Sequence, residues 1–364
     1  MKVVNIVGAR PQFIKLAPVL RAIKRYNQKY PKNVIESVII HTGQHYDYEM
    51  SQIFFEELEI EEPDYYLEVG SGSHGHQTGE ILKRTEDVLL SERPDLVIVY
   101  GDTNSTLGGA LAAAKLHIPV AHVEAGLRSF NRQMPEEINR VLTDHISDLL
   151  FCPTKVAVEN LKREGIEKGV YFVGDVMYDS VLYNIKLAEK NSEIMSYLRL
   201  KPKTYALATV HRAGNTDNYQ RLITIFQALE KIAQEIIPVI LPLHTRTRRR
   251  LEKLGIVLKN VRIFEPLSYL DMLLLEKNAR VILTDSGGVQ KEAFFLKVPC
   301  ITLREETEWI ETVETGWNTL VGCNIEKILE AVQTAKPGKK NCNPYGDGQA
   351  ADKIVSIIVK GYEG

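Results

Sequence analysis

The feature that limits the fold most is a regular alternation, along all 364 residues, between short hydrophobic runs and longer stretches with helical periodicity. The runs are rich in Val, Ile and Leu, and this alternation is typical of βαβ units that build a parallel sheet. In the first half of the chain it predicts strands at 3–7, 37–41, 96–100, 119–123, 149–152 and 170–173. In the second half it predicts strands at 205–210, 238–241, 261–264, 281–284, 299–303 and 319–321. The expected fold class is therefore α/β.

The two sets of strands indicate two domains. A chain of 364 residues is longer than a single hydrophobic core usually extends, so two cores are expected on size alone. The strand rhythm pauses in a charged helical stretch around 185–199, and we place the boundary after residue 180. The prediction is one Rossmann-like domain at 1–180 and a second that begins at residue 181.

Composition and charge exclude several classes of protein. Hydrophobic residues make up 44% of the chain and charged residues 25%, as in ordinary folded proteins. No apolar run reaches membrane-spanning length, and the first residues do not read as a signal peptide. The four cysteines are too few and too widely spaced for a disulfide scaffold or a CxxC motif, so we expect a cytoplasmic protein. With 45 Lys and Arg against 47 Asp and Glu, we expect no general attraction to nucleic acid or to anionic membranes.

Ligands of open parallel sheets bind beyond the carboxyl ends of the strands, so the residues that follow each predicted strand are the first candidates for a site. Strand 3–7 is followed by Gly8-Ala9-Arg10-Pro11 and, one turn into a helix, by Lys15. Cations in the first turn oppose the helix dipole, so Arg10 and Lys15 are predicted to bind an anion such as phosphate. The segment lacks GxGxxG, which argues against a dinucleotide cofactor.

Carboxylates follow two neighbouring strands of the first domain. Asp102 comes after strand 96–100, and Glu124 comes directly after strand 119–123. A further acidic pair, Glu136 and Glu137, stands behind Pro135 at the start of a predicted helix. Because a carboxylate there interacts favourably with the helix dipole, the residues alone favour a structural role for this pair.

The second domain carries polar residues at corresponding places. His211 follows strand 205–210 and can donate to a phosphate or transfer a proton. Strand 281–284 is followed by Asp285-Ser286-Gly287-Gly288, whose glycines let the amides of a helix N-terminus approach phosphate oxygens. Glu292 lies four residues after Gly288 on the same helix and can bind ribose hydroxyls. Together the strand ends predict a cleft for a phosphorylated ligand.

A glycine-rich segment at 70–76 is predicted to be a mobile loop. It contains His74 and His76, but the sequence offers no third metal ligand beside them. We therefore expect two solvated histidines and no metal site.

These segments resemble the non-hydrolysing UDP-N-acetylglucosamine 2-epimerase family, which has the GT-B type of fold. The resemblance covers nearly the whole chain. The matching stretches are Gly8-Ala9-Arg10-Pro11, Gly101-Asp102-Thr103, His122-Val123-Glu124-Ala125-Gly126-Leu127-Arg128, Pro135-Glu136-Glu137, His211-Arg212, Thr284-Asp285-Ser286-Gly287-Gly288 and Asn343-Pro344-Tyr345-Gly346-Asp347-Gly348-Gln349-Ala350.

The resemblance implies two Rossmann-like parallel-sheet domains, at 1–180 and 181–348, which face across a cleft, and a helix at 349–364 that packs back on the first domain. It also implies a homodimer that requires neither NAD nor a metal ion. The family's reaction eliminates UDP to leave a 2-acetamidoglucal, then adds UDP again with the proton returned to the opposite face of C2. UDP-GlcNAc and UDP-ManNAc would be interconverted in this way, as precursors of surface polysaccharides or other glycans.

The family's functional residues can be carried over one by one. Asp102, Glu124 and Glu136 would be the acid/base carboxylates near C2, which replaces the structural role favoured above for Glu136. His211 would assist on the phosphate side. The groups that bind UDP and its diphosphate would be Arg10, Lys15, Ser286, Gly287, Gly288 and, at the ribose, Glu292.

Two departures leave the substrate open. The segment 129–134 is shorter than in the N-acetylglucosamine enzymes, and Trp309 replaces an arginine usual after Thr307-Glu308. Both features resemble the sister group that acts on UDP-2,3-diacetamido-2,3-dideoxyglucuronic acid. Many bacterial relatives also bind an activating second substrate molecule near the segment that corresponds to Gln44-His45-Tyr46-Asp47, and the resemblance does not decide whether this chain does so.

Three other classes of protein fit the sequence less well than an epimerase. A GT-B glycosyltransferase would use the same UDP contacts but would pass the sugar to an acceptor, and the dense carboxylate set fits proton removal and return better. A non-catalytic UDP-sugar sensor would not need acid/base groups. An NAD-dependent dehydrogenase would need the glycine fingerprint that is missing here.

Overall fold

The computed structural model of the chain describes residues 1–44 and 55–362. His45, Tyr46 and Asp47, which belong to the segment compared with the activator site, lie outside the described residues. The chain forms two compact units, one of residues 1–180 with 343–364 and one of residues 181–342.

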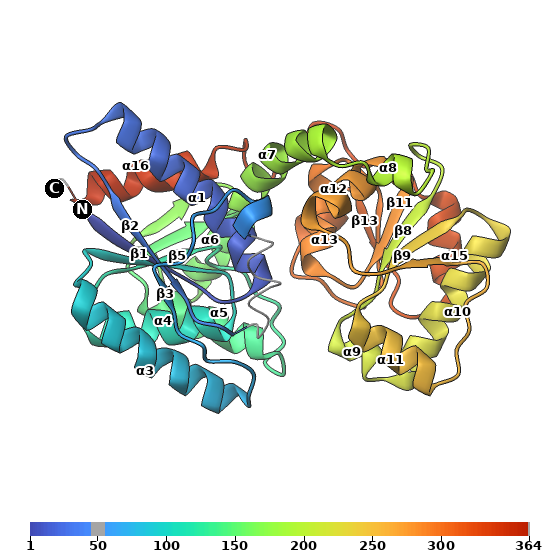
Figure 1. Ribbon diagram of the computed structural model, residues 1–364, viewed down its shortest axis with the longest axis horizontal. Helices are drawn as coiled ribbons and strands as arrows, with labels where there is room; N and C mark the ends of the chain where they lie inside the picture. The colour runs from blue at the N-terminus through green and yellow to red at the C-terminus, as the bar shows by residue number, and fades with distance from the viewer. Residues whose placement is uncertain (45–54, 363–364) are drawn as a thin grey trace. The chain divides into compact units, whose positions relative to one another are not determined.

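The first unit is built on a seven-stranded parallel sheet with the order β3-β2-β1-β4-β5-β6-β7. Its strands are β1 (Lys2–Val7), β2 (Glu36–His41), β3 (Tyr65–Tyr66), β4 (Leu96–Tyr100), β5 (Val120–Val123), β6 (Leu149–Cys152) and β7 (Val170–Phe172). Its helices are α1 (Arg10–Lys29), α3 (His74–Glu92), α4 (Asn104–Lys115), α5 (Pro135–Ile146), α6 (Lys155–Arg163) and α16 (Ala350–Tyr362). Helices α1 and α16 cover one face of the sheet, and α3 and α4 cover the other (Figure 1).

The core of the first unit follows from the side chains of its central strands. Val4 and Ile6 of β1 and Val99 of β4 are fully buried and pack with small residues of α4 such as Ala110 and Ala113. Burying each valine or isoleucine contributes roughly 1.5–3 kcal/mol, and the small side chains let α4 lie close to the sheet. The core thereby joins the central strands β1 and β4 to α4.

Helix α16 packs on α1 within this unit. Arg25 of α1 forms an ion pair with Asp352 of α16, with Nη2 and Oδ1 2.7 Å apart. The amides of Ala350 and Ala351, at the start of α16, donate to the carboxylate of Asp179 at 3.1 and 2.8 Å. The C-terminal segment is thus anchored to the first unit by side-chain and backbone contacts.

The second unit contains a six-stranded parallel sheet with the order β10-β9-β8-β11-β12-β13. Its strands are β8 (Ala206–Thr209), β9 (Val239–Pro242), β10 (Arg262–Phe264), β11 (Val281–Thr284), β12 (Cys300–Thr302) and β13 (Asn318–Leu320). Its helices are α8 (Ile194–Tyr197), α9 (Ala213–Thr216), α10 (Tyr219–Glu235), α11 (Thr245–Lys253), α12 (Tyr269–Asn278), α13 (Gly287–Phe295), α14 (Ile310–Glu314) and α15 (Ile325–Thr334), while α7 (Val176–Asn191) begins in the first unit and ends in the second. Helices α12 and α13 cover one face of this sheet, and α10 and α15 cover the other (Figure 1).

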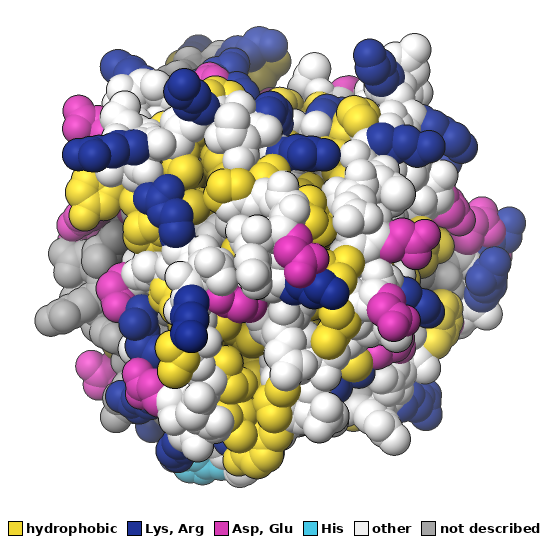
Figure 2. Space-filling model, turned by 90° about the vertical axis from the view of Figure 1, so that its right-hand side faces the viewer, with side chains coloured by type: hydrophobic (Ala, Val, Ile, Leu, Met, Phe, Trp, Pro, Cys, Tyr) yellow, Lys and Arg dark blue, Asp and Glu magenta, His cyan; other side chains and the backbone are white. Residues whose placement is uncertain are grey.

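The face of the molecule seen in Figure 2 carries side chains of both charges. Lys and Arg are interspersed with Asp and Glu, and hydrophobic side chains lie between them. Across residues 1–44 and 55–362, no helix has the length and apolar character needed to cross a membrane.

The predicted fold class, two parallel-sheet α/β domains, is confirmed. All twelve predicted strands are present with ends shifted by no more than two residues, and β3 is an additional short strand. The predicted loop at 70–76 is partly wrong, because His74 and His76 lie in the first turn of α3. Among the described residues, no three His, Cys, Asp or Glu side chains are grouped so that they could hold a metal ion.

Candidate active site

Both sheets have a switch point where the strand order reverses, between β1 and β4 in the first unit and between β8 and β11 in the second. Doubly wound sheets bind ligands beyond the carboxyl ends of the strands at such points. Of the ten predicted site residues, the first unit contains Arg10, Lys15, Asp102, Glu124 and Glu136, and the second contains His211, Ser286, Gly287, Gly288 and Glu292.

Lys15 and Glu124 form a buried ion pair in the first unit. Lys15 lies in the second turn of α1, Glu124 directly follows β5, and the Lys15 Nζ to Glu124 Oε1 distance is 2.5 Å. The two side chains are only 8% and 5% exposed. Gly101, which follows β4, lies against this pair: a Cβ there would come within 2.8 Å of Lys15 Nζ, and the φ of +65° also favours glycine. The sequence placed both charged residues at strand ends but did not predict that they pair.

The backbone of Glu124 is in the left-handed region, with φ of +78°. This conformation is unfavourable for a residue with a side chain and stores about 1–3 kcal/mol of strain. The strained turn is held because the amides of Glu124 and Ala125 both donate to the carbonyl of Phe151 at 3.1 Å. The fold therefore directs this one carboxylate toward Lys15 at a measurable energetic cost, as is common at functional sites.

Asp102 is fixed by Arg140 of α5. The Nε and Nη2 atoms of Arg140 donate to Asp102 Oδ2 at 3.0 and 2.6 Å, and Nη1 donates to Glu137 Oε2 at 2.9 Å. The amide side chain of Asn139 donates to the backbone carbonyl of Asp102 at 2.9 Å. Arg140 is almost fully buried, so the Asp102 carboxylate has a defined direction. No pattern in the sequence indicates this role of Arg140.

Glu136 and Glu137 have different environments in the first turn of α5. Glu137 is buried and accepts from the amides of Ser129 and Phe130 at 2.8 and 2.9 Å. Burial opposes its ionisation, but the hydrogen bonds from Ser129, Arg140 and Phe130 outweigh burial and lower the pKa of Glu137. Glu136 is half-buried, and its side chain forms no hydrogen bond or ion pair within the described part of the chain. The structural role that the residues alone favoured for the pair thus belongs to Glu137.

Arg10 is the first residue of α1, and the loop before it is tightly held. The side-chain oxygen of Gln12 accepts from the amides of Gly8 and Ala9 at 2.8 and 3.0 Å, while its nitrogen donates to the carbonyl of Tyr100 at 2.9 Å. Gly8 has no space for a side chain, because a Cβ would lie 1.9 Å from Thr42 Oγ1. Gln12 therefore connects the ends of β1 and β4, a function that the sequence pattern did not reveal.

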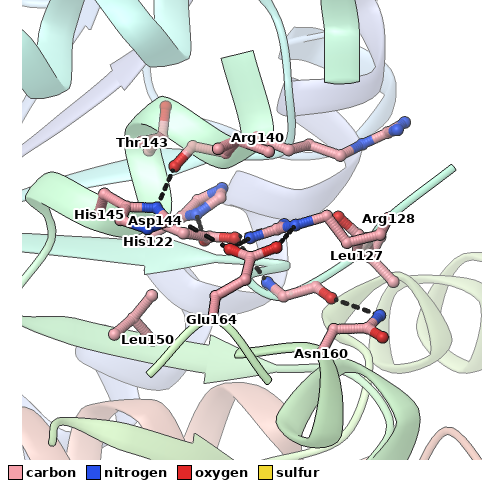
Figure 3. A network of polar contacts seen from close by, with 12 residues as sticks. His122, Leu127, Arg128, Arg140, Thr143, Asp144, His145, Leu150, Asn160 and Glu164 are labelled. Carbon is pink, nitrogen blue, oxygen red and sulfur yellow. Dashed lines mark hydrogen bonds and ion pairs between the residues drawn. The ribbon is translucent and has the colours of Figure 1, made fainter. Parts of the chain in front are cut away.

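A buried network connects β5, α5 and α6 (Figure 3). His122 of β5 places Nδ1 2.7 Å from Asp144 Oδ1 and Nε2 2.7 Å from the carbonyl oxygen of Gly101. Asp144 Oδ2 accepts from the amide of Gly126 at 3.1 Å and from Arg128 Nη1 at 2.7 Å. Arg128 also donates through Nε and Nη2 to the two carboxylate oxygens of Glu164, each at 2.7 Å.

In the second unit, a buried carboxylate organises the segment that carries His211. Asp285, directly after β11, accepts from the amides of His211 at 3.1 and 3.2 Å and of Arg212 at 3.1 Å. It also accepts from Asn215 Nδ2 at 3.0 Å. His211 is exposed, whereas Asp285 is completely buried. Asp285 therefore joins the ends of β8 and β11.

Helix α13 begins where the sequence predicts amides that approach a phosphate. Ser286 is its N-cap, and its hydroxyl accepts from the amide of Val289. A Cβ on Gly287 would lie 2.7 Å from Glu308 Oε1 and 3.1 Å from Trp309 Nε1, so a larger residue would collide with the segment before α14. Gly288 is the second residue of α13, and Glu292 lies buried further along it.

These features define a class of protein: a doubly wound α/β enzyme with carboxylates, cations and a histidine at its strand ends. Carboxylates in such places can accept and return protons, and fixed cations and amides can stabilise negative charge on a ligand.

The chain belongs to the UDP-N-acetylglucosamine 2-epimerase family, whose sequence profile matches residues 28–359. Proteins of this family are isomerases. A Methanococcus maripaludis protein described as a UDP-N-acetylglucosamine 2-epimerase homolog is 58% identical, over 98% of this chain and 99% of that protein. The UDP-2,3-diacetamido-2,3-dideoxy-D-glucuronate 2-epimerase of Pseudomonas aeruginosa is 50% identical, over 99% of this chain and all of that protein.

The fold is shared with a solved structure of the family. The UDP-GlcNAc 2-epimerase of Methanocaldococcus jannaschii, determined in complex with UDP-GlcNAc and UDP, superposes with a TM-score of 0.91 at 50% identity, covering 99% of this chain and all of that one. The predicted GT-B type of fold is confirmed by this similarity.

Proposed function

We propose that this chain interconverts UDP-GlcNAc and UDP-ManNAc by inverting C2 of the sugar, through elimination of UDP and its re-addition. The family and the relatives at 50–58% identity support this proposal. The structural observation that supports it most is the placement of Asp102 and Glu124 after neighbouring strands, each paired with a buried cation. Inversion at C2 needs groups that remove a proton from one face and return it to the other, and two fixed carboxylates meet that need.

The proposed reaction has two half-steps. A carboxylate takes the proton from C2, the C1–O bond breaks, and its electron pair leaves with UDP, so that a C1–C2 double bond remains. In the reverse sense, a UDP oxygen attacks C1 and a proton is added to the opposite face of C2. Asp102, Glu124 and Glu136 are the proposed acid/base groups, and which of them serves which face is decided by isotope exchange in variants.

The remaining predicted residues are proposed to bind the nucleotide. Departure of UDP increases negative charge on the diphosphate, and fixed donors that bind this charge more strongly in the transition state lower the barrier. His211 is proposed to assist on the phosphate side and Glu292 to bind the ribose. The proposed diphosphate donors are Arg10, Lys15, Ser286, Gly287 and Gly288.

The second candidate substrate is UDP-2,3-diacetamido-2,3-dideoxyglucuronic acid, supported by sequence identity and by Trp309. The Pseudomonas aeruginosa diacetamido-glucuronate enzyme is 50% identical to this chain, as is the UDP-GlcNAc enzyme of Methanocaldococcus jannaschii. Trp309, a residue in which the chain resembles the diacetamido-glucuronate group, is buried beside Gly287, and Lys291 Nζ lies 4.0 Å from the centre of its ring.

Proton NMR in deuterated water decides between the two substrates. The chain is incubated with UDP-GlcNAc alone, without an acceptor, metal or added cofactor. Formation of UDP-ManNAc with deuterium at C2 supports the proposal. If UDP-GlcNAc is unchanged while the diacetamido-glucuronate analogue is epimerised, the second substrate is correct, and if neither reacts, the proposed reaction is wrong.

We further propose that the protein acts in the cytoplasm as a homodimer, which the family resemblance supports. Light scattering coupled to size exclusion measures the assembly directly. A mass of about twice 41.2 kDa is expected, and a mass of one chain at micromolar concentration contradicts the dimer.

A further inference from the structure

His122 is held between two hydrogen-bond acceptors. Asp144 Oδ1 lies 2.7 Å from Nδ1, and the carbonyl oxygen of Gly101 lies 2.7 Å from Nε2. A carbonyl oxygen can only accept, so Nε2 must carry a proton.

Asp144 is surrounded by donors. Its Oδ2 accepts from the Gly126 amide and from Arg128, so both oxygens of this carboxylate have donors beside them. Burial alone would raise the pKa of Asp144, but the contacts with His122 and Arg128 outweigh burial and lower it. The two carboxylate oxygens of Asp144 are thus held separately, Oδ1 beside Nδ1 of His122 and Oδ2 by Arg128 and the Gly126 amide.

The network acts on the two loops that carry the reacting carboxylates. The carbonyl that His122 binds belongs to Gly101, the residue before Asp102. The amide that Asp144 binds belongs to Gly126, two residues after Glu124. Figure 3 shows the side chains of Asp144, His122 and Arg128 converging at this point. Asp144 therefore contacts both loops, one directly and the other through His122, and these short contacts limit the distance between the loops.

We propose that His122 and Asp144 are positioning residues, which fix Asp102 and Glu124 relative to each other for proton transfer at C2. This inference rests on the proposed function, since it assigns those two carboxylates to the reaction. The competing explanation is a buried ion network that only stabilises the fold. If the two residues position the carboxylates, their variants lose much more kcat than a loss of stability accounts for. In that case a glutamine and an asparagine at residue 122 also retain different amounts of kcat.

Substitutions at residue 122 test the contact with Gly101 separately from the contact with Asp144. A glutamine can place its amide nitrogen near the position of Nε2, and an asparagine can place its nitrogen near Nδ1. His122→Gln therefore retains a donor for the Gly101 carbonyl, whereas His122→Asn retains a donor for Asp144. Asp144→Asn keeps the shape of Asp144 and removes its charge.

Glu164→Gln is the matched control. Glu164 contacts the same Arg128, and its side chain is 27% exposed. Its carboxylate accepts from Arg128 and not from Gly101 or Gly126, so the variant changes the network without removing a hydrogen bond to either loop. It is expected to lower the melting temperature, because the buried Arg128 loses a charged partner, while kcat stays within about twofold.

The experiment measures kcat, KM, UDP affinity and melting temperature for the wild type and the four variants. Misplacing reacting groups by about 1 Å reduces turnover about 100-fold, so His122→Asn and Asp144→Asn should lose that much kcat while KM and UDP affinity stay within about threefold. His122→Gln should retain about tenfold more kcat than His122→Asn. Equal losses in His122→Gln and His122→Asn, or a loss in Glu164→Gln as large as in Asp144→Asn, overturn the proposal.

Nitrogen-15 NMR of the histidine rings tests the contact with the Gly101 carbonyl independently of turnover. Protein labelled at its 9 histidines is compared with His122→Gln to assign the His122 signal. A proton on Nε2 is expected, because the carbonyl oxygen beside it can only accept. A bare Nε2 overturns the inference even when the wild type epimerises its substrate, whereas an inactive wild type contradicts the proposed function instead.

Discussion

Lys15 Nζ lies 2.5 Å from Glu124 Oε1, and both side chains are almost completely buried. Lys15, which is proposed to bind the diphosphate, and Glu124, a proposed acid/base group, therefore interact directly. A diphosphate bound near Lys15 would compete with Glu124 for the Lys15 ammonium group, which links the proposed nucleotide contact to the position of the carboxylate.

Removing either member of this pair should destabilise the fold strongly. Loss of one partner from a buried ion pair typically lowers the free energy of unfolding by about 3–5 kcal/mol, which we expect for Lys15→Met and for Glu124→Gln. In the double variant the loss should be smaller than the sum of the two, although activity remains absent. Urea unfolding of the four proteins measures this coupling. The control is Lys24→Met, which changes an exposed lysine of the same helix and should alter stability little. Additive losses of unfolding free energy in the double variant would contradict the pairing.

Arg140→Lys should reduce turnover more than nucleotide binding. Lysine keeps the charge but cannot donate from two nitrogens to Asp102 and from a third to Glu137, so the direction of the Asp102 carboxylate is lost. We expect kcat to fall about 10- to 100-fold with UDP affinity nearly unchanged. Steady-state kinetics and calorimetric UDP titration check both values. Arg132→Lys, at an exposed position of the preceding loop, should behave as wild type.

Asp285→Asn should weaken UDP binding through the backbone of the His211 segment. The variant loses acceptor capacity for the amides of His211 and Arg212, and unsatisfied buried donors lower stability by about 1–3 kcal/mol. We expect the Kd for UDP to rise about tenfold, equivalent to about 1.4 kcal/mol. Calorimetry is the measurement, and Asp217→Asn, at a half-exposed ion pair on the same segment, is the control. An unchanged Kd would show that Asp285 serves only the fold.

Asp179 should make stability depend on pH. Burial, helped by the nearby Asp175 and Asp352 and opposed by two amides of α16, raises the pKa of Asp179 to about 6. The folded protein then binds this proton more tightly than the unfolded chain, whose pKa is about 3.9. The contribution is stabilising below about pH 4 and is lost as pH rises through about 6. Over that range Asp179→Asn should gain about 1–3 kcal/mol relative to wild type, measured by urea unfolding at several pH values; a constant difference would contradict the shifted pKa.

The fold was largely predictable because its signals are local. A buried parallel strand needs a short run of Val, Ile and Leu, and each such run in the sequence became a strand. The candidate site residues were found by the same means, since they directly follow strands such as β4 and β5. The error at His74 and His76 has a local cause too, because glycine and serine around them read as a loop although the helix begins at His74.

The partners of those site residues were not predictable, because they depend on contacts between distant segments. Gln12 reaches Thr106, which is 94 residues away, and His122 reaches Asp144, which is 22 residues away. No periodicity marks these residues, since a buried polar side chain in a strand or helix looks like an interruption of the pattern.

The amino-acid sequence by itself thus determined the two parallel sheets, the helices between their strands and the family, because hydrophobic periodicity and strand-end residues are properties of short segments. Only the tertiary structure decided that Lys15 pairs with Glu124, that Arg140 orients Asp102, and that Glu137 rather than Glu136 anchors its loop. These pairings depend on burial. An unpaired buried charge costs free energy, so each charged side chain stays bonded to the partner that the packed elements bring within hydrogen-bond distance.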